Sequence, residues 1–481
     1  MTASVRHKLR QFASLCRLRP FDTSTEGGRS KERLRRAGLT TVTSMLSRAI
    51  GLLTSLVSVP LTFRYLGTER YGIWMVLISI IAAMGFADLG IGNGLMNAIS
   101  EAHGKDDRPL AREYVTSALG LMLCIAAVLA VVGTAAYPFL PWMRLFNVKS
   151  SAAAADGAKA FLILYASFVV NIPLGVISRA QSGLQKGYAA QMINAFGSVL
   201  SLGAMLLIIW LHGNLAWLVS ASVVAGITTT LLNGWILFRD HPWLMPSADA
   251  FRRSSANKIF KLGLMFFVLQ STFAIAYTSD NIVIAQVLGA AAVAIYAVPQ
   301  KLFGMISVVV GMGINPLWPA YGEALARGDV AWVRRTFFGS LWLTLAITVP
   351  SCAALALAGP WILRVCMGKS LHVPMSLLIV LAVWGVVNSV SNVVGVLLNG
   401  VGILRQQMFV AVVVSLVNLA LSVYFARRLG ALGVCLGSIV TQLLITLPLY
   451  SVLIQRSFRR LIAHNTAIVS LQESWNHGAT L

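Results

Sequence analysis

The chain has 481 residues, of which 57% are hydrophobic and 11% charged, and its formal net charge is +22. Soluble domains carry about 25% charged residues, so this composition excludes an ordinary soluble protein. The apolar residues form blocks of about 20, long enough for a helix to cross a bilayer, without the alternation of barrel strands. The cations lie mainly in tails and short loops, so we expect no nucleic-acid partner.

Twelve apolar blocks follow one another along the chain, and each is predicted to form a transmembrane helix. They span residues 39–63, 71–97, 114–138, 159–178, 190–211, 215–237, 262–287, 292–316, 334–358, 373–398, 407–426 and 430–454. The sequence therefore predicts an all-α polytopic membrane protein.

Lys and Arg in the flanking segments set the predicted orientation. The N-terminal tail, residues 1–38, carries ten of them against three acids, and the loops on its side hold more cations than the opposite loops. Cytoplasmic loops carry the excess of Lys and Arg. Both the N-terminal tail and the C-terminal tail, residues 456–481, are therefore predicted to be cytoplasmic.

The chain contains an internal repeat at an offset of 222 residues, without a gap from about residue 66 to residue 125. Apolar matches are common by chance in such a chain, whereas several polar matches at one offset are not. The polar matches are Asn93 with Asn315, Glu101 with Glu323, Asp107 with Asp329, and Arg112 with Arg334.

The repeat divides the membrane part into two lobes of six helices. The N-lobe is predicted over 39–238 and the C-lobe over 262–455, with the basic segment 239–261 as a cytoplasmic linker. Because each lobe has an even number of helices, both enter from the same side. They are expected to be related by a pseudo-two-fold axis along the membrane normal, with a site between them near mid-membrane.

Asp88 lies inside the apolar block 71–97. Counted from Gly67, at the turn between the first two blocks, Arg48 lies 19 residues before and Asp88 lies 21 residues after. Two antiparallel helices would place these side chains at matched depth, about 30 Å from the turn. An intramembrane ion marks a candidate functional site, so Arg48 and Asp88 are predicted to pair.

The second lobe repeats the arrangement at another depth. Asp280 lies 9 residues before Gly289 and Lys301 lies 12 residues after it. Both are expected close to mid-membrane, where a charge costs at least ~2.5–3.5 kcal/mol. A structural alternative stays open for both pairs: the ions only hold helices together, and Arg48 and Asp88 reach the interface by snorkelling.

Several segments of the sequence resemble a known family. They are "RYLGTERYGIW", "ADLGIGNGLMNAISEAHGKDD", "SGLQKGY" and "LLNGVGILRQQ", and the likeness runs from about residue 38 to residue 455. The sequence resembles the polysaccharide transporter family, which includes the Wzx-type O-antigen and exopolysaccharide flippases. This family belongs to the multidrug/oligosaccharidyl-lipid/polysaccharide exporter superfamily.

The resemblance implies a flippase that moves a polyprenyl-pyrophosphate-linked oligosaccharide across the bacterial inner (plasma) membrane through a cationic cavity. On this hypothesis Arg48 and Lys301 bind the pyrophosphate, which needs cations or N–H donors. Asp88 and Asp280 hold these cations or couple transport to protons. The expected partners are the lipid-linked oligosaccharide, membrane lipids, and a polysaccharide polymerase and glycosyltransferases.

Other functions fit the sequence less well. A drug or cation antiporter of the same superfamily needs a cavity rich in carboxylates, whereas this chain has 38 Lys and Arg against 16 acids. A membrane enzyme needs catalytic groups outside the membrane, but the longest predicted outer loop, 139–158, holds Asp156 as its one acid and no His. Nothing resembles a channel filter. We therefore expect no catalytic residue, no metal site and no cofactor.

Overall fold

The computed structural model describes residues 19–143, 151–367, 373–456 and 458–459. Within these ranges, eleven helices are long and apolar enough to cross a membrane, and the first of them bends at Gly67 into two. The described residues contain helices and turns but no strand. This confirms the predicted all-α polytopic class. The chain divides into two compact units, residues 1–267 and 268–481.

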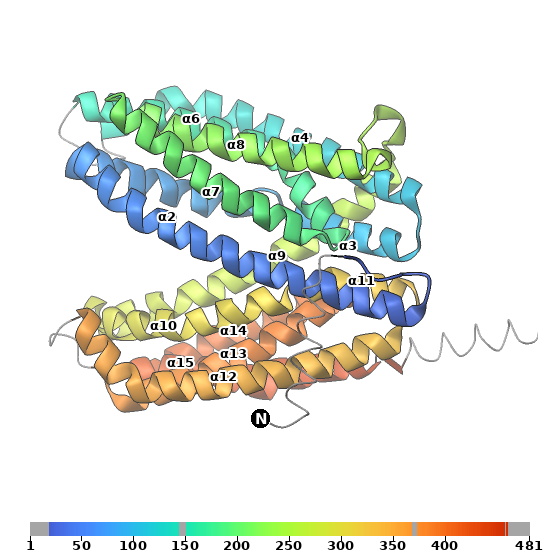
Figure 1. Ribbon diagram of the computed structural model, residues 1–481. Helices are drawn as coiled ribbons and strands as arrows, with labels where there is room; N and C mark the ends of the chain where they lie inside the picture. The colour runs from blue at the N-terminus through green and yellow to red at the C-terminus, as the bar shows by residue number, and fades with distance from the viewer. Residues whose placement is uncertain (1–18, 144–150, 368–372, 457, 460–481) are drawn as a thin grey trace, which may run out of the picture. The chain divides into compact units, whose positions relative to one another are not determined.

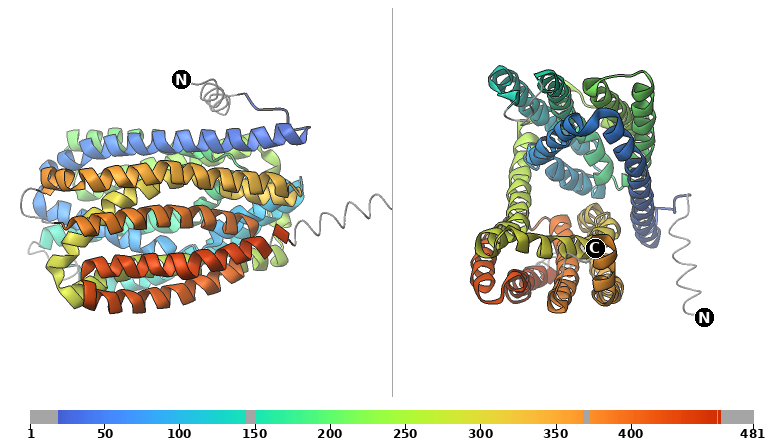
Figure 2. Two further views of the ribbon diagram at one scale, coloured as in Figure 1. Left: turned by 90° about the horizontal axis from the view of Figure 1, so that it is seen from below. Right: turned by 90° about the vertical axis from the view of Figure 1, so that its left-hand side faces the viewer.

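Unit 1 is built around α6, which packs against α2, α3, α4 and α8 (Figures 1 and 2). Its elements are α2 (Glu26–Ala83), the 3-10 turn η1 (Met84–Phe86), α3 (Ile91–Gly104), α4 (Arg108–Ala136), η2 (Tyr137–Phe139), α6 (Ser151–Gly183), α7 (Gly187–Trp210), α8 (Leu215–Asp240), η3 (Pro242–Leu244), η4 (Ala248–Ala250) and the first part of α9 (Arg253–Leu288). Apolar side chains of α3, α4 and α6 form its largest buried core.

Unit 2 is built around α13, which packs against α10, α11, α12 and α15. Its elements are the second part of α9, α10 (Ala290–Ile314), α11 (Leu317–Ala326), α12 (Val330–Met367), α13 (Met375–Val401), α14 (Leu404–Leu429), α15 (Ala431–Thr441) and the π-helical turn η6 (Gln442–Thr446). Its core draws on α10, α12, α13 and α15.

Two glycines make the turns that start the repeat. Gly67 has φ 73° and ψ 175°, and Gly289, 222 positions later, has φ 90° and ψ 162°. A side chain is disfavoured at positive φ, so glycine allows both bends. The same backbone conformation at the same offset supports the predicted repeat at the level of local structure.

The segments after these turns repeat their polar contacts as well. Asp107 Oδ1 accepts a hydrogen bond of 3.0 Å from the backbone N–H of Leu110, and Asp329 Oδ1 accepts one of 3.1 Å from Trp332. Both are N-cap bonds at the start of a membrane helix.

An ion pair on the preceding short helix is repeated too. Glu101 pairs with Lys105 at 2.7 Å, and Glu323 pairs with Arg327, each four residues later. All four positions obey the 222-residue offset.

Glycine also fixes the packing of the short helices α3 and α11. A Cβ on Gly183 would lie 2.8 Å from Cβ of Ile99, and one on Gly400 would lie 2.8 Å from Cβ of Tyr321. Real Cβ atoms essentially never approach so closely. Ile99 and Tyr321 are repeat mates, so the two units seat their short helices against a glycine in the same way.

The predicted single helix over 71–97 is wrong. The helix ends at Ala83, and the chain passes through η1 and a turn before α3 begins at Ile91. Leu89 and Gly90 have φ values of 48° and 71°, outside the helical region. Hydropathy does not register this break, because the residues of the turn are themselves mostly apolar.

The predicted N-terminal tail is partly helical. Residues 26–38 form the first turns of α2, while residues 1–18 and 460–481 lie outside the described residues. The predicted linker, 239–261, contains η3, η4 and the start of α9.

Candidate functional site

Asp88 lies in the turn between η1 and α3 rather than on a helix. Its Oδ1 accepts a hydrogen bond of 3.0 Å from the backbone N–H of Gly90, and its carbonyl accepts one of 3.0 Å from Ile91. A helix start leaves backbone N–H groups without intrahelical partners. The Asp88 carboxylate thus lies in the apolar stretch at a position where it can accept hydrogen bonds from these backbone N–H groups.

Arg179, near the end of α6, is the cation that interacts electrostatically with Asp88. Its Nη1 donates a hydrogen bond of 2.6 Å to Oδ1 of Asn93 in the first turn of α3. A Cβ on Gly92 would lie 2.8 Å from Arg179 Nε and 3.0 Å from Asp88 Oδ2, so the missing side chain makes room for both groups. The sequence analysis did not predict a role for Arg179.

Arg48 lies on α2 with its side chain exposed. Among the described residues, no ion pair joins Arg48 to Asp88. The predicted pairing assumed two continuous helices, whereas the turn at 84–90 carries Asp88 off the second helix and toward α6. Arg48 is therefore available to a ligand, but Asp88 does not hold it in place.

Asp280 is buried in unit 2, with 4% of its surface exposed. The Tyr296 hydroxyl donates a hydrogen bond of 3.2 Å to Asp280 Oδ2, and Gln300 Nε2 donates one of 3.2 Å to the Tyr296 oxygen. Asp280 Oδ1 is buried without a hydrogen-bond partner in the described structure. Tyr296 and Gln300 lie one turn apart on α10, a spacing that sequence reasoning did not connect with Asp280.

Lys301 follows Gln300 directly but is exposed. Consecutive helical residues point about 100° apart, since a turn takes 3.6 residues, so Gln300 faces the buried side while Lys301 faces outward. In the described part of the chain, no ion pair joins Lys301 to Asp280. The predicted match in depth did not determine which faces of the helices carry Asp280 and Lys301.

Unit 2 contains a second set of polar side chains that the sequence analysis did not predict. Ser307 lies 3.1 Å from Ser389, and Asn388 Nδ2 donates to the Ser307 hydroxyl at 3.3 Å. The Ser391 hydroxyl donates at 3.2 Å to Gln442, the first residue of the π-helical turn. Such turns often occur at functional sites, and these residues add a polar layer to unit 2.

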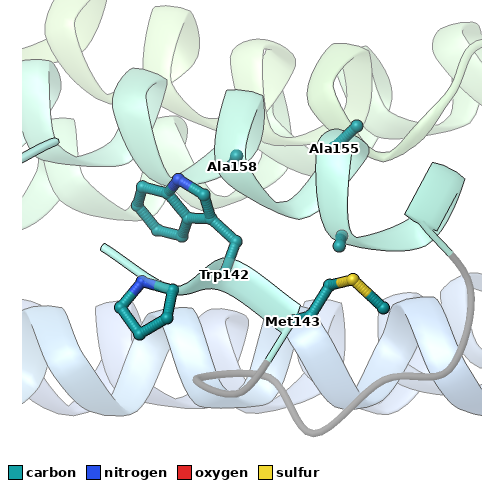
Figure 3. Close-up of a pocket in the computed structure, with 6 residues that line it drawn as sticks. Trp142, Met143, Ala155 and Ala158 are labelled. Carbon is teal, nitrogen blue, oxygen red and sulfur yellow. The ribbon is translucent and has the colours of Figure 1, made fainter. Parts of the chain in front are cut away.

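An apolar pocket of about 450 Å³ lies at the other end of unit 1, where α6 begins (Figure 3). Its lining residues are Pro141, Trp142, Met143, Ala154, Ala155 and Ala158. These side chains include one donor, the indole N–H, and no charge. The pocket is therefore unsuited to an anionic sugar-diphosphate group.

Metal ligation finds no support in the described residues, where no group of three or more His, Cys, Asp or Glu side chains comes together. The candidate site residues form two separate groups instead. Arg179 interacts with Asp88 and Asn93 in unit 1. Asp280, Tyr296 and Gln300 are linked by hydrogen bonds in unit 2.

Comparison with protein families identifies the class of this chain. The family described as polysaccharide biosynthesis protein matches residues 39–324, more than half of the sequence. The chain belongs to the polysaccharide biosynthesis protein family. This membership confirms the resemblance seen in its sequence segments.

Curated relatives of this polysaccharide biosynthesis protein cover most of its length. It is 21% identical over 403 residues to a putative O-antigen export protein of Yersinia pseudotuberculosis, covering 83% of this chain and 91% of the relative. It is 23% identical over 418 residues to a putative O-antigen transporter of Salmonella typhimurium, with the same two coverages.

Solved structures share its fold. An outward-facing multidrug resistance MATE family transporter of the MOP superfamily superposes with a TM-score of 0.74 at 16% identity, covering 90% of this chain and 96% of that one. A MOP superfamily transporter from Pyrococcus furiosus gives a TM-score of 0.72 at 15% identity, covering 89% and 96%. At these identities the likeness establishes the fold alone.

Proposed function

We propose that this protein is a flippase, not an enzyme, that moves a polyprenyl-pyrophosphate-linked oligosaccharide across the bacterial inner membrane by alternating access. The observation that carries the proposal is its similarity to O-antigen transporters over 83% of the chain, together with its membership of the polysaccharide biosynthesis protein family. The bias of Lys and Arg supports the orientation with both termini in the cytoplasm.

Three cations are the candidates for contact with the pyrophosphate. Arg48 and Lys301 are exposed side chains on membrane helices, and an exposed cation can exchange water for anionic oxygens. Arg179 is partly buried and already oriented by Asn93. Arginine presents a planar fork that matches phosphate oxygens, whereas lysine presents a point charge.

Asp280 is the candidate for coupling. It is buried among membrane helices with one oxygen unpartnered and with no cation paired to it in the described structure. An uncompensated buried charge is costly, so binding of a proton or a small cation would be favourable there. Asp88 is the weaker candidate, because Arg179 and the backbone N–H of Gly90 already interact with it.

A drug or cation antiporter is the second candidate function. The observation in its favour is the same unpaired Asp280, since an antiporter of this kind needs a carboxylate that exchanges protons for a cation. The acidic residues of the chain are few, 16 against 38 Lys and Arg, which favours an anionic substrate.

Deletion of the gene in its native host separates these functions. A flippase mutant loses surface polysaccharide and accumulates polyprenyl-pyrophosphate-linked sugars in the inner leaflet, and the wild-type gene restores both. An antiporter mutant keeps its surface polysaccharide and becomes more sensitive to cationic drugs, a result that would overturn the proposal. Glycosyltransferases and a polymerase are the expected functional partners.

A further inference from the structure

We propose that Arg36, Lys186, His241 and Arg108 form a binding site for a phosphate-ester anion, at the end of unit 1 where α2 and α4 begin and α6 and α8 end. These residues come from four separate parts of the chain. The site is distinct from the Arg179 cluster and does not require the proposed transport activity.

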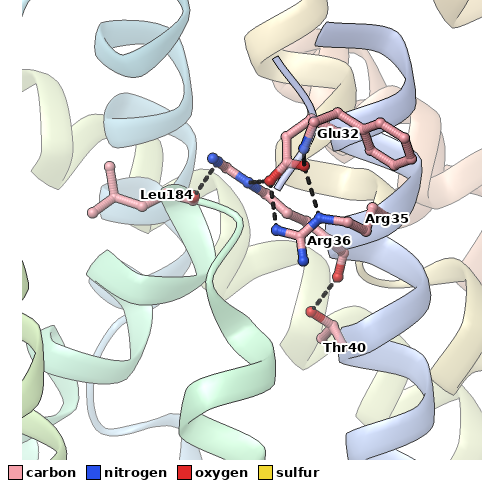
Figure 4. Close-up of polar contacts among 6 residues, drawn as sticks. Glu32, Arg35, Arg36, Thr40 and Leu184 are labelled. Carbon is pink, nitrogen blue, oxygen red and sulfur yellow. Dashed lines mark hydrogen bonds and ion pairs between the residues drawn. The ribbon is translucent and has the colours of Figure 1, made fainter. Parts of the chain in front are cut away.

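Arg36 lies next to the end of α6 (Figure 4). Its Nη1 donates a hydrogen bond of 3.3 Å to the carbonyl of Leu184, and its Nε pairs with Glu32 at 2.9 Å. Glu32 also receives two hydrogen bonds of 2.7 Å from Arg35. One carboxylate thus pairs with two guanidinium groups.

Lys186 follows in the turn between α6 and α7. Its Nζ lies 3.6 Å from Asp240 at the end of α8, and Asp240 is half exposed. Lys186 is close enough to Arg36 for the two cations to interact. Burial and the charge of Arg36 lower the pKa of Lys186 from its ordinary value, although Asp240 opposes the change.

His241 and Arg108 both contact Trp243. The ring of His241 meets Trp243 edge-on at 5.6 Å, and the guanidinium of Arg108 lies over the same indole at 5.7 Å. His241 Nε2 is buried and has no hydrogen-bond partner in the described structure. A buried polar atom without a partner is unfavourable, so a phosphate oxygen that accepted a hydrogen bond from this nitrogen would be bound favourably.

The electrostatic environment of His241 is mainly positive. Burial lowers its pKa, Lys186, Arg36 and Arg108 lower it further, and Asp240 alone raises it. Cations that destabilise one another in this way are stabilised by an added anion. Arg36, Lys186 and His241 are half-buried, so water solvates them less than the exposed cations of the positive-inside rule, whereas Arg108 is itself exposed.

The class of ligand follows from the positive charge of the site and from its position at the ends of membrane helices. Basic groups between membrane helices at the cytoplasmic face suit the headgroups of anionic lipids, and arginine, lysine and protonated histidine all donate to phosphate oxygens. Two sources share this chemistry: phospholipids of the inner leaflet and a polyprenyl pyrophosphate. Both are phosphate esters on a membrane anchor, and the test treats them separately.

The test uses the full chain in phosphatidylcholine nanodiscs and counts bound ligand by native mass spectrometry. The probes are phosphatidylglycerol, undecaprenyl pyrophosphate and inorganic pyrophosphate. Lys186→Gln should weaken binding of the lipid probes about tenfold, the effect of one charge-assisted hydrogen bond. Arg253→Gln is the matched control, because it removes an exposed cation at the start of α9 and should leave binding unchanged.

A second variant is expected to strengthen binding, a result that misfolding of the protein would not produce. Asp240→Asn removes the carboxylate that competes for Lys186 and should tighten binding severalfold. Lowering the pH from 7.5 to 5.5 should strengthen binding to the wild-type protein, because an anion favours protonated His241, and this strengthening should be lost in His241→Gln.

Each outcome decides the proposal. Binding of either lipid probe that falls in Lys186→Gln and rises in Asp240→Asn supports it, and the probe that binds identifies the source. Equal binding to all variants overturns it. The proposal also fails if the variants alter only the melting temperature, because the cations would then serve just to neutralise the carbonyl ends of α6 and α8.

Discussion

Arg179 donates a hydrogen bond of 2.6 Å to Asn93, and this contact joins the end of α6 to the first turn of α3. The same guanidinium faces the carboxylate of Asp88 in the preceding turn. One cation therefore stabilises a break between two helices through a neutral amide and a charged acid together.

We predict that Arg179→Ala destabilises the protein by about 1–3 kcal/mol, because it leaves Asn93 Oδ1 without its donor and removes the cation that interacts with Asp88. The measurement is the melting temperature in detergent, with surface polysaccharide scored in a complemented deletion strain. The double variant Arg179→Ala with Asp88→Asn should recover much of the lost stability. If it also restored export, Arg179 would have a structural role alone.

The variant Asp280→Asn should distinguish a role of Asp280 in coupling transport to protons from a role in folding. The carboxylate has no cation paired to it in the described structure, so the neutral amide should keep or raise the melting temperature. Export should nevertheless be lost, because the amide cannot bind and release a proton. Asp249→Asn, an exposed acid in η4, is the control. Normal export by Asp280→Asn would remove Asp280 from the coupling hypothesis.

Arg48→Ala and Lys301→Ala should reduce export without loss of stability. Both side chains are exposed, and no ion pair is left broken by their removal within the described ranges. Arg48→Lys should export better than Arg48→Ala, since it keeps the charge but loses the fork. The measurements are membrane protein level and surface polysaccharide. A large fall in protein level would instead indicate a structural role.

The repeated N-caps should contribute equally to stability. Asp107→Ala and Asp329→Ala each remove the carboxylate that accepts a hydrogen bond from a backbone N–H at the start of a helix, at a cost of about 1 kcal/mol. We expect similar decreases in melting temperature for the two variants. Clearly unequal decreases would argue that the two segments are not equivalent despite their shared offset.

The orientation is tested by single cysteines at Lys105 and Lys159, both exposed and at opposite ends of unit 1. In intact cells, an impermeant thiol reagent should label the cysteine at position 159 and spare the one at position 105, with the native cysteines replaced. Labelling of both, or the reverse pattern, would contradict the predicted cytoplasmic termini.

The sequence by itself determined the features that depend on short stretches of chain. Runs of apolar residues fix where helices cross a membrane, because a helix satisfies all its own backbone groups in lipid. Gly67 and Gly289 fix the two turns, because glycine tolerates positive φ. The repeat was visible in polar residues such as Glu101 and Glu323, whose local contacts the structure then reproduced.

Only the tertiary structure decided which charges meet. Hydropathy does not distinguish a helix face turned toward lipid from one turned toward another helix, and it does not reveal the break that takes Asp88 off the helix, so it could not predict the partner of Asp88. Because the helix is interrupted for a few residues before α3, Asp88 lies near Arg179. On α10, Gln300 is buried, whereas the next residue, Lys301, is exposed. Such pairings depend on helix rotation and packing, which are set by contacts far apart in the chain.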